Sequence, residues 1–475
     1  MFFQVVLFII CISAFPLQGA PAQNSTQPLT GNTEGITAFV GVNVIPMDSE
    51  RILEAQTVIV RRGVISEIGP ATTVKIPDAA LRVEARGKYL LPGLTDFHIH
   101  LRSPDELLSY LSYGVTTVVL LSGATSGAPD LLRYRDELAE GRLIGPQLFT
   151  TGPILDGSPP IFPGVSVTVE TPEEARTIVL QQKRAGYNFI KVYNNIMPDV
   201  LSAIITEAHK QSMAVVGHIP RKAGREKALQ QTLMAGVDII AHGEEYFFTF
   251  FYGSVDSLLD LGQVPHVDEK RIPTAVRLSK EAGVTVIPNL SFVAMTRKQL
   301  DDLHGVLTDQ ETRYLHPDVL AMWKSQNPAR RPDLTRFDLR EKAKFIFLKK
   351  LTKALNEAGV PLLLGTDASA PGLFPGKSAH TELQELESAG LSPFDALAAG
   401  TRNAGKFINE HVSSSRPFGT VSPGHEANLI LLDENPLLNI WNMSTLQGVM
   451  VGGKWHTQEE LIKKREELAG SYSKP

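Results

Sequence analysis

The residues in this sequence best suited to chemistry are histidines at the ends of apolar segments. His98 and His100 stand two positions apart in LPGLTDFHIH. Because alternate side chains of a strand point to the same face, both imidazoles can reach one metal ion. A His-X-His pair also arises by chance, but this one ends the first of a series of strand-like segments, where barrel enzymes carry their active sites. Asp96 shares the same face, and we expect it to support the two histidines rather than to bind the ion.

Two more histidines end segments of the same kind. His218 closes the run VVGH and His242 closes the run IIAH. One histidine in such a place is usually a structural residue. Two of them, at the same end of neighbouring strands, favour metal ligands.

Asp367 ends the last strand-like segment, LLGTD. An aspartate in this position either caps a following turn or binds a metal and takes the proton of an attacking water. In a closed barrel the last strand lies beside the first. Asp367 would then adjoin His98 and His100, so we favour the second role.

Lys191 lies inside an apolar segment, FIKVY. A bare buried ammonium is costly, so this lysine must lose its proton, find an acidic partner or be modified. A neutral amine can react with carbon dioxide to give a carbamate, whose two oxygens can bridge two metal ions. The plainer alternative is an amine that reaches the rim and pairs with an acid there.

Strands are needed to position these residues. Apolar segments alternate with amphipathic helical segments such as 172–185, 198–211 and 339–358, a pattern typical of parallel βαβ units. We therefore predict an α/β fold in which residues 91–410 form a (β/α)8 TIM barrel. Its eight strands are expected at 90–101, 116–121, 147–154, 188–194, 214–219, 238–243, 285–290 and 362–367.

Shorter β-like runs flank the barrel and predict a second, smaller domain. The runs before it suggest a small antiparallel sheet, and the natural partners for this sheet are the runs after the barrel. We expect residues 35–90 and 416–458 to form one small β-sandwich domain, followed by a C-terminal tail at 459–475. The runs lie at 36–45, 57–61, 64–68, 81–84, 428–432 and 448–451.

Two other parts of the barrel can be anticipated. The long connection 290–339 is rich in proline, arginine and aromatic residues, and we expect it to add helices and a lid over the site. We expect one final helix at 393–408.

The N-terminus predicts export. Residues 2–15 are almost wholly apolar and are followed by Ala20-Pro21-Ala22, as in a signal peptide, here 1–22, that is cleaved near Ala20 to Ala22. This run is too short for a stable membrane span. We therefore expect a periplasmic or extracellular enzyme. Cys11, the single cysteine of the 475 residues, lies inside this segment, and the net charge of −5 gives no basic surface for nucleic acid.

Taken together, the motifs resemble the amidohydrolase superfamily, in its imidazolonepropionase-like and prolidase-like branch. Residues 91–100 look like its first-strand signature, 189–193 like its bridging-lysine strand, 364–367 like its last strand, and 419–430 like its return into the β-sandwich. Two stretches depart from close relatives: NNIMP after Tyr193, and Glu244-Glu245 after His242. Both lie where substrate would bind, so the substrate of relatives does not transfer.

The resemblance implies a binuclear site, with Zn²⁺ as the metal. His98, His100 and Asp367 would hold the more buried ion, and His218 and His242 the more exposed one. Lys191, carboxylated by carbon dioxide, would bridge the two ions together with a hydroxide. Asp367 would act as general base and then as general acid.

The function that follows is hydrolysis of a peptide-like C–N amide bond in a small molecule or short peptide, as by a dipeptidase or carboxypeptidase. Arg221 and Arg225 either grip a substrate carboxylate or belong to a solvated helix face. Tyr193 either supports the oxyanion or packs in the core. A lactonase or cyclic-amide hydrolase on the same metals is the second hypothesis, and a non-catalytic binding protein on the same scaffold is the third. The sequence leaves open whether the enzyme is a homo-oligomer.

Overall fold

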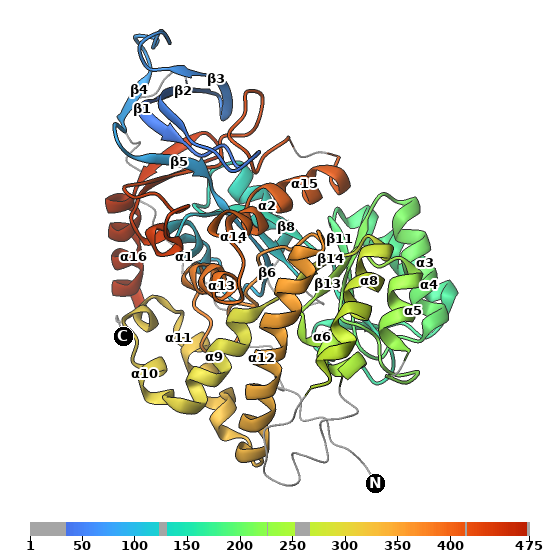
Figure 1. The fold of residues 1–475 in the computed structure, drawn as a ribbon. Helices are drawn as coiled ribbons and strands as arrows, with labels where there is room; N and C mark the ends of the chain where they lie inside the picture. The colour runs from blue at the N-terminus through green and yellow to red at the C-terminus, as the bar shows by residue number, and fades with distance from the viewer. Residues whose placement is uncertain (1–34, 123–130, 226, 252–266, 414–415, 473–475) are drawn as a thin grey trace.

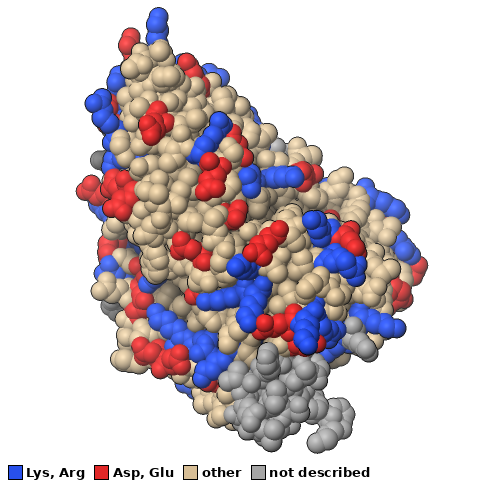
Figure 2. Space-filling model, in the orientation of Figure 1, with Lys and Arg blue, Asp and Glu red and all other residues tan. Residues whose placement is uncertain are grey.

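The computed structural model describes residues 35–122, 131–225, 227–251, 267–413 and 416–472. The predicted signal peptide at 1–22 lies outside these residues. Among the helices in the described ranges, none combines the length and the apolar character that crossing a membrane requires. Acidic and basic side chains are mixed over the face drawn in Figure 2.

Strands from both ends of the chain form one eight-stranded sheet, at the top of Figure 1. Its centre is the antiparallel pair of β5 and β15, so the chain leaves the central domain beside the strand by which it enters. The sheet is mixed, because β1 pairs in parallel with β4 and β5, and the expectation of a purely antiparallel sheet was wrong. The strands are β1 (Ile36–Val44), β2 (Leu53–Arg61), β3 (Val64–Pro70), β4 (Leu81–Glu84), β5 (Tyr89–Pro92), β15 (Leu429–Leu432), β16 (Leu446–Val451) and β17 (Lys454–Thr457).

The central domain contains two parallel sheets. One has the order β6-β7-β8, and the other has the order β10-β9-β11-β12-β13-β14. Asn188 donates a backbone hydrogen bond of 2.9 Å to the Thr150 carbonyl and so joins β8 to β11. The strands are β6 (Leu94–Ile99), β7 (Val115–Leu120), β8 (Gln147–Thr150), β9 (Ile154–Asp156), β10 (Ser166–Thr168), β11 (Phe189–Val192), β12 (Ala214–Gly217), β13 (Ile239–Ala241) and β14 (Thr285–Ile287).

The segment 362–368 joins the free edges of these two sheets. Leu363 donates to the Val286 carbonyl of β14 at 3.0 Å, and Phe97 of β6 donates to the Leu364 carbonyl at 2.8 Å. Hydrogen-bonded segments therefore follow one another in a ring. The regular strand expected at 362–367 was wrong, because the backbone N–H groups of this segment donate to different partners: Leu363 to Val286, Leu364 to Ala399 and Asp367 to His98.

One apolar cluster draws side chains from β6, β7, β8, β11, β12, β13, β14 and segment 362–368. Phe407 of α15 (Arg402–His411) packs against it, with its ring centroid 5.5 Å from that of Phe97. Burying such side chains contributes roughly 1.5–3 kcal/mol each, so this cluster holds the segments in place. The residues of the ring that form this cluster include Phe97, Val119, Phe149, Phe189, Val216, Ile239, Ile287 and Leu363.

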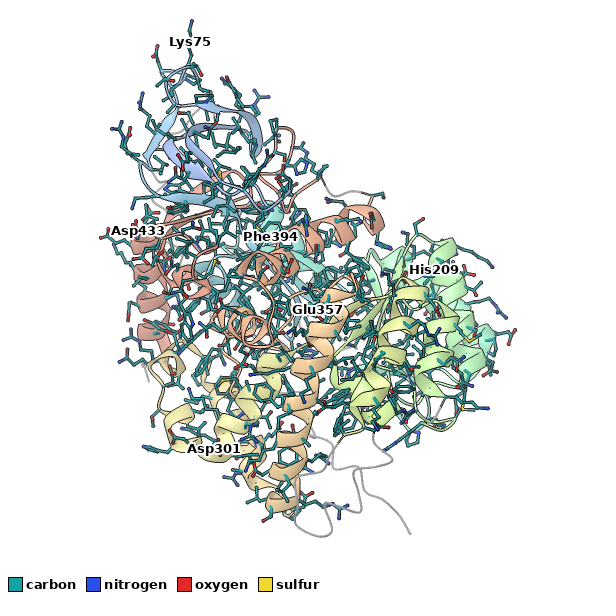
Figure 3. The ribbon with its side chains drawn as sticks, viewed as in Figure 1. Lys75, His209, Asp301, Glu357, Phe394 and Asp433 are labelled. Carbon is teal, nitrogen blue, oxygen red and sulfur yellow. The ribbon has the colours of Figure 1, made fainter. Side chains whose placement is uncertain are left out.

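Helices cover the outside of the ring (Figure 1). The sequence explains α3 well: Thr171 and Glu174 form a capping box, Pro172 begins the helix, and Gly186 ends it at a left-handed φ of 93°. Figure 3 labels His209 on α4, in the outer layer of helices, far from Lys75 at the eight-stranded sheet. The helices that follow the strands are α1 (Glu106–Ser112), α2 (Leu131–Ala139), α3 (Pro172–Ala185), α4 (Pro198–Lys210), α5 (Ala228–Ala235), α6 (Glu244–Tyr246) and α8 (Ile272–Ala282).

The long connection after β14 contains the expected additional helices, at the bottom of Figure 1. Trp323 in this connection is fully buried and donates a hydrogen bond of 3.1 Å to the Ser369 carbonyl, just after Asp367. The connection therefore packs on the last segment of the ring, whereas its movement as a lid stays a prediction. It comprises α9 (Leu290–Asp301), α10 (Leu303–Leu307), η4 (Gln310–Tyr314), α11 (Pro317–Gln326), η5 (Pro328–Arg330) and α12 (Leu334–Glu357).

Three predicted elements are divided in the structure. The strand expected at 90–101 is β5 and β6, separated at Gly93, where a Cβ would lie 2.2 Å from Thr116 Cγ2. The strand expected at 147–154 is β8 and β9. The helix expected at 393–408 is α14 (Pro393–Gly400) and α15, broken at Thr401.

The last part of the chain is not a simple tail. Residues 459–475 were expected to be a tail, but α16 (Gln458–Tyr472) occupies most of them. Leu461 is fully buried, and Arg465 forms an ion pair of 2.5 Å with Glu311. These contacts hold the helix against the rest of the protein.

Candidate metal centre

The ends of β6 and of segment 362–368 bring three potential metal ligands together. Asp367 Oδ1 lies 2.7 Å from His100 Nε2 and 3.4 Å from His98 Nε2. One ligand atom from each of the three residues lies within 4.8 Å of the others. Two imidazoles and one carboxylate are a donor set that suits Zn²⁺.

His242 and His218 extend this group across β13 and β12. The ring centroids of His98 and His242 are 4.6 Å apart, and those of His242 and His218 are 4.9 Å apart. His242 Nε2 lies 4.0 Å from Asp367 Oδ2. The histidines predicted from the ends of three strands thus lie side by side.

Lys191 is the sixth predicted ligand, and it lies on β11 between β9 and β12. Its side chain is buried, and among the described residues its Nζ has no hydrogen-bond partner. Burial lowers the pKa of the amine to about 8, although Asp367 and Glu245 oppose the shift. The pairing of Lys191 with an acid at the rim, the plainer alternative, is therefore absent from this part of the structure.

The electrostatics of the site favour neutral histidines beside an ionised aspartate. Burial, with the charge of Lys191, lowers the pKa of His98 well below its usual range. Burial also lowers the pKa of His218 and His242. For Asp367, burial alone would raise the pKa, but the interactions with His100, His242 and Lys191 lower it overall. Neutral imidazole and carboxylate are the forms that bind metals.

Neighbouring groups orient the ligands. Asp96 accepts hydrogen bonds from the backbone N–H of His98 at 3.2 Å and from Thr366 Oγ1 at 2.6 Å, so it ties β6 to segment 362–368. Ser122 Oγ lies 2.7 Å from His100 Nδ1. Asp96 therefore supports the ligands through the backbone.

Backbone strain gathers at the same place. His242, Asn289 and Asp367 have left-handed φ values of 72°, 52° and 66°. Non-glycine residues in this conformation cost on the order of 1 kcal/mol, and such residues concentrate at functional sites. This strain agrees with a binding role for the end of the ring where the three residues lie.

The predicted substrate contacts fall in different surroundings. The half-buried Tyr193 packs its ring 4.0 Å from that of His218. Arg221 lies 3.4 Å from Glu245 Oε2 and above the Phe248 ring. Arg225 is exposed in the turn before α5. Tyr193 and Arg221 thus adjoin the histidines, whereas Arg225 lies outside the buried cluster.

Two further acidic residues have defined contacts near the site. Glu245 is buried and lies 3.0 Å from His218 Nδ1. Glu382 accepts hydrogen bonds from the backbone N–H groups of Leu290 at 3.1 Å and Ser291 at 2.6 Å, and so caps α9. Glu245 precedes an aromatic run at 246–252, whereas Glu382 lies in the mostly polar stretch SAHTELQELES.

The comparison with known proteins agrees with this site. The profile of the amidohydrolase family matches residues 89–456, so the chain belongs to the amidohydrolase family, as the sequence motifs predicted. The ochratoxinase of Aspergillus niger is 24% identical to this chain, and the match covers 85% of this chain and 82% of the relative.

Two solved structures share the fold. The bottromycin amidohydrolase superposes with a TM-score of 0.71 at 22% identity, over 92% of this chain and 91% of that chain. A putative prolidase from Bifidobacterium longum superposes with a TM-score of 0.64 at 24% identity, over 91% of this chain and 99% of that chain.

Proposed function

We propose that this protein is a (β/α)8-barrel hydrolase that cleaves an amide bond in a small peptide-like substrate with the help of two divalent ions, of which zinc is the expected metal. The observation that carries the proposal is the gathering of His98, His100, His218, His242 and Asp367 around one end of the ring, next to the buried Lys191.

The donor atoms of this chain suit such ions. His98, His100 and Asp367 would hold one ion, and His218 and His242 the other. The Lys191 amine is buried and has no hydrogen-bond partner in the described structure. Burial of an unpaired polar group is costly, and conversion of the amine to an anionic carbamate that binds the ions would remove this cost. A carbamate on this nitrogen would supply one oxygen to each ion.

Bound ions would lower the pKa of a water molecule and polarise the scissile carbonyl. Asp367 has the position to accept a proton from that water, because its carboxylate faces His98, His100 and His242. Its lowered pKa keeps the carboxylate ionised and so free to take that proton. It would then give the proton to the leaving amine. Tyr193, beside His218, would support the carbonyl oxygen.

The substrate is expected to be a dipeptide or an N-acyl amino acid. A free carboxylate on such a molecule calls for a guanidinium, which Arg221 supplies next to the ligands. Arg225, exposed before α5, is the outer candidate for the same role. The named relatives, an ochratoxinase and a putative prolidase, are compatible with this substrate class.

A substrate panel tests the proposal. Zinc-loaded protein and the variant Asp367→Asn would be assayed against dipeptides, N-acyl amino acids, lactones and cyclic amides. Turnover of a linear amide by the native protein, lost in the variant, is the expected result. Turnover of lactones or cyclic amides alone would support the second hypothesis. A protein that binds no metal and cleaves nothing would be a binding protein.

We also propose that the protein is exported. The apolar residues 2–15 and the small residues at 20–22 support this. N-terminal sequencing of the protein recovered outside the cytoplasm should begin near Ala20 to Ala22. An intact N-terminus on a cytoplasmic protein would contradict export.

A further inference from the structure

The connection between β9 and β10, residues 157–165, lies against the segment that follows β11. Asp156, the last residue of β9, holds the two stretches together. Its buried carboxylate accepts hydrogen bonds from the backbone N–H groups of Gly157 at 2.9 Å, Ile161 at 2.8 Å and Asn195 at 2.7 Å. One side chain thus fixes both ends of this contact.

Further contacts fix the same connection. Asn195 Nδ2 donates a hydrogen bond of 2.7 Å to the Pro159 carbonyl. Lys222 Nζ, from the segment after β12, donates to the Ser158 carbonyl. At Gly157 a Cβ would lie 1.8 Å from the Asn195 carbonyl oxygen, so a larger residue would push the two stretches apart. The connection is therefore held at several points, although it forms no helix or strand.

This arrangement determines the position of Phe162. Its carbonyl accepts backbone hydrogen bonds from Val165 at 3.1 Å and from Ser166, the first residue of β10, at 3.0 Å. Its partly exposed ring packs against that of Tyr193, with the centroids 5.4 Å apart and the planes at 63°. The Tyr193 ring in turn lies 4.0 Å from that of His218. Three rings therefore form a row from the connection to His218.

Arg221 follows the same row of rings along the chain. Its backbone N–H donates a hydrogen bond of 2.8 Å to the carbonyl of Asn194, the residue after Tyr193. The segment that carries the proposed carboxylate-binding guanidinium is thus joined to the segment that carries the tyrosine. A substrate held by Arg221 with its amide at the histidines would have Tyr193 and Phe162 beside it.

We propose that Phe162 is a specificity-determining residue that, together with Tyr193, favours an apolar side chain on the substrate residue whose carboxylate Arg221 binds. An apolar side chain that covers the two rings leaves water and removes the rings from water as well. A hydroxylated or charged side chain would lose water there and gain no hydrogen bond from Phe162. The inference rests on the proposed amide hydrolysis and narrows its substrate class.

The ratio of kcat/KM for two substrates tests this role. Zinc-loaded native protein and Phe162→Ala would be assayed with N-acetyl-leucine and N-acetyl-serine. We expect the native protein to prefer N-acetyl-leucine and this preference to fall about 10-fold in the variant, with kcat/KM for N-acetyl-serine nearly unchanged. Phe162→Leu, which keeps an apolar side chain, should retain most of the preference. Phe345→Ala is the matched control, because Phe345 is a partly exposed phenylalanine of α12 that lies under Lys349, and its ratio should equal that of the native protein.

Asp156→Asn tests how Phe162 is held in place. The amide nitrogen that replaces one carboxylate oxygen cannot accept a hydrogen bond, so at least one of the three backbone N–H groups loses its acceptor. We expect the connection to loosen and the preference for N-acetyl-leucine to fall as in Phe162→Ala. If Phe162→Ala does not fold, the ratio measured for Asp156→Asn decides the question.

The outcomes separate this inference from the proposed function. An equal loss of kcat/KM for both substrates in Phe162→Ala, an unchanged ratio in both variants, or a native preference for N-acetyl-serine would overturn the role of Phe162 and leave amide hydrolysis standing. A native protein that cleaves no linear amide would overturn the proposed function, and this inference with it.

Discussion

His100 and Asp367 lie 2.7 Å apart, Nε2 to Oδ1, although 267 positions separate them along the chain. The contact exists because segment 362–368 lies against β6 and donates the Asp367 N–H to the His98 carbonyl at 2.7 Å. The backbone that closes the ring is therefore also the backbone that assembles the ligands. Changes to either should affect both stability and metal binding.

Asp367→Asn should lower kcat by about 10²- to 10⁴-fold. The amide keeps the size of the side chain but neither accepts the proton of an attacking water nor carries the charge that faces the histidines. Steady-state kinetics together with metal analysis check this prediction. A variant with native kcat would show that another group moves the proton.

Lys191→Ala should remove metal and activity together. The proposed bridge requires the Lys191 nitrogen, so we expect fewer than two ions per chain and a loss of turnover above about 100-fold. Atomic emission analysis and kinetics on the same preparation measure both. Two retained ions would show that Lys191 is a structural residue.

Removal of the metal should destabilise the folded protein. Ligands that bind only the native state add about 4 kcal/mol of stability at 1,000 times their Kd. Chelation should therefore lower Tm and abolish turnover, and added zinc should restore both. A Tm that is the same with and without chelator would argue against ions bound at the six residues.

Glu382 predicts a dependence of stability on pH. Burial raises the pKa of this carboxyl from 4.5 to about 7, against the hydrogen bonds from Ser291 and Leu290. The folded state thus holds a proton that the unfolded state has lost between these values, so the contribution of Glu382 to stability falls as pH rises from about 4.5 to 7. Glu382→Gln removes this dependence.

The measurement for Glu382 is Tm at pH 5 and pH 8. We expect the free energy of unfolding of Glu382→Gln relative to the native protein to rise between the two pH values, by an amount on the order of 1–3 kcal/mol, and the Tm of the variant relative to the native protein to rise with it. A difference that is constant with pH would mean that Glu382 is ionised throughout.

Gly93→Ala should disrupt the junction of β5 and β6. The new Cβ would lie 2.2 Å from Thr116 Cγ2, so β7, which carries Thr116, would have to move away from the junction, at a cost of about 1–3 kcal/mol or more. Soluble yield and Tm report this. Gly470→Ala on α16 is the control, because a Cβ there meets nothing within 4 Å, and a helical alanine should be neutral or add up to about 1 kcal/mol.

The family and most of the alternation of strands and helices could be predicted from the sequence, because apolar periodicity and helix-ending glycines are local signals. The sequence did not predict the division of 90–101 at Gly93. There the backbone changes its hydrogen-bond partner, from the Asn428 carbonyl at Gly93 to the Gly114 carbonyl at Leu94, and both partners are distant in the sequence. The irregular segment 362–368 was missed for the same reason. Its shape depends on hydrogen bonds with β6 and β14.

The site shows the same division. His98, His100 and Asp367 were predicted from strand ends, and the structure places their ligand atoms within 4.8 Å of one another. The contacts of Glu245 could not be predicted from the sequence, because Ile219 and Arg221, which it contacts, follow another strand. Arg221, for which the sequence offered either a substrate contact or a solvated helix face, forms an ion pair of 3.4 Å with Glu245.

The crystal structure of the zinc-loaded protein, with anomalous scattering recorded at the zinc edge, tests the central claim most directly. We predict two peaks roughly 3.5–4 Å apart, one among His98, His100 and Asp367 and the other beside His218 and His242, with continuous density from Lys191 Nζ to both. One peak, no peak, or an unmodified Lys191 apart from the ions would contradict the two-ion site.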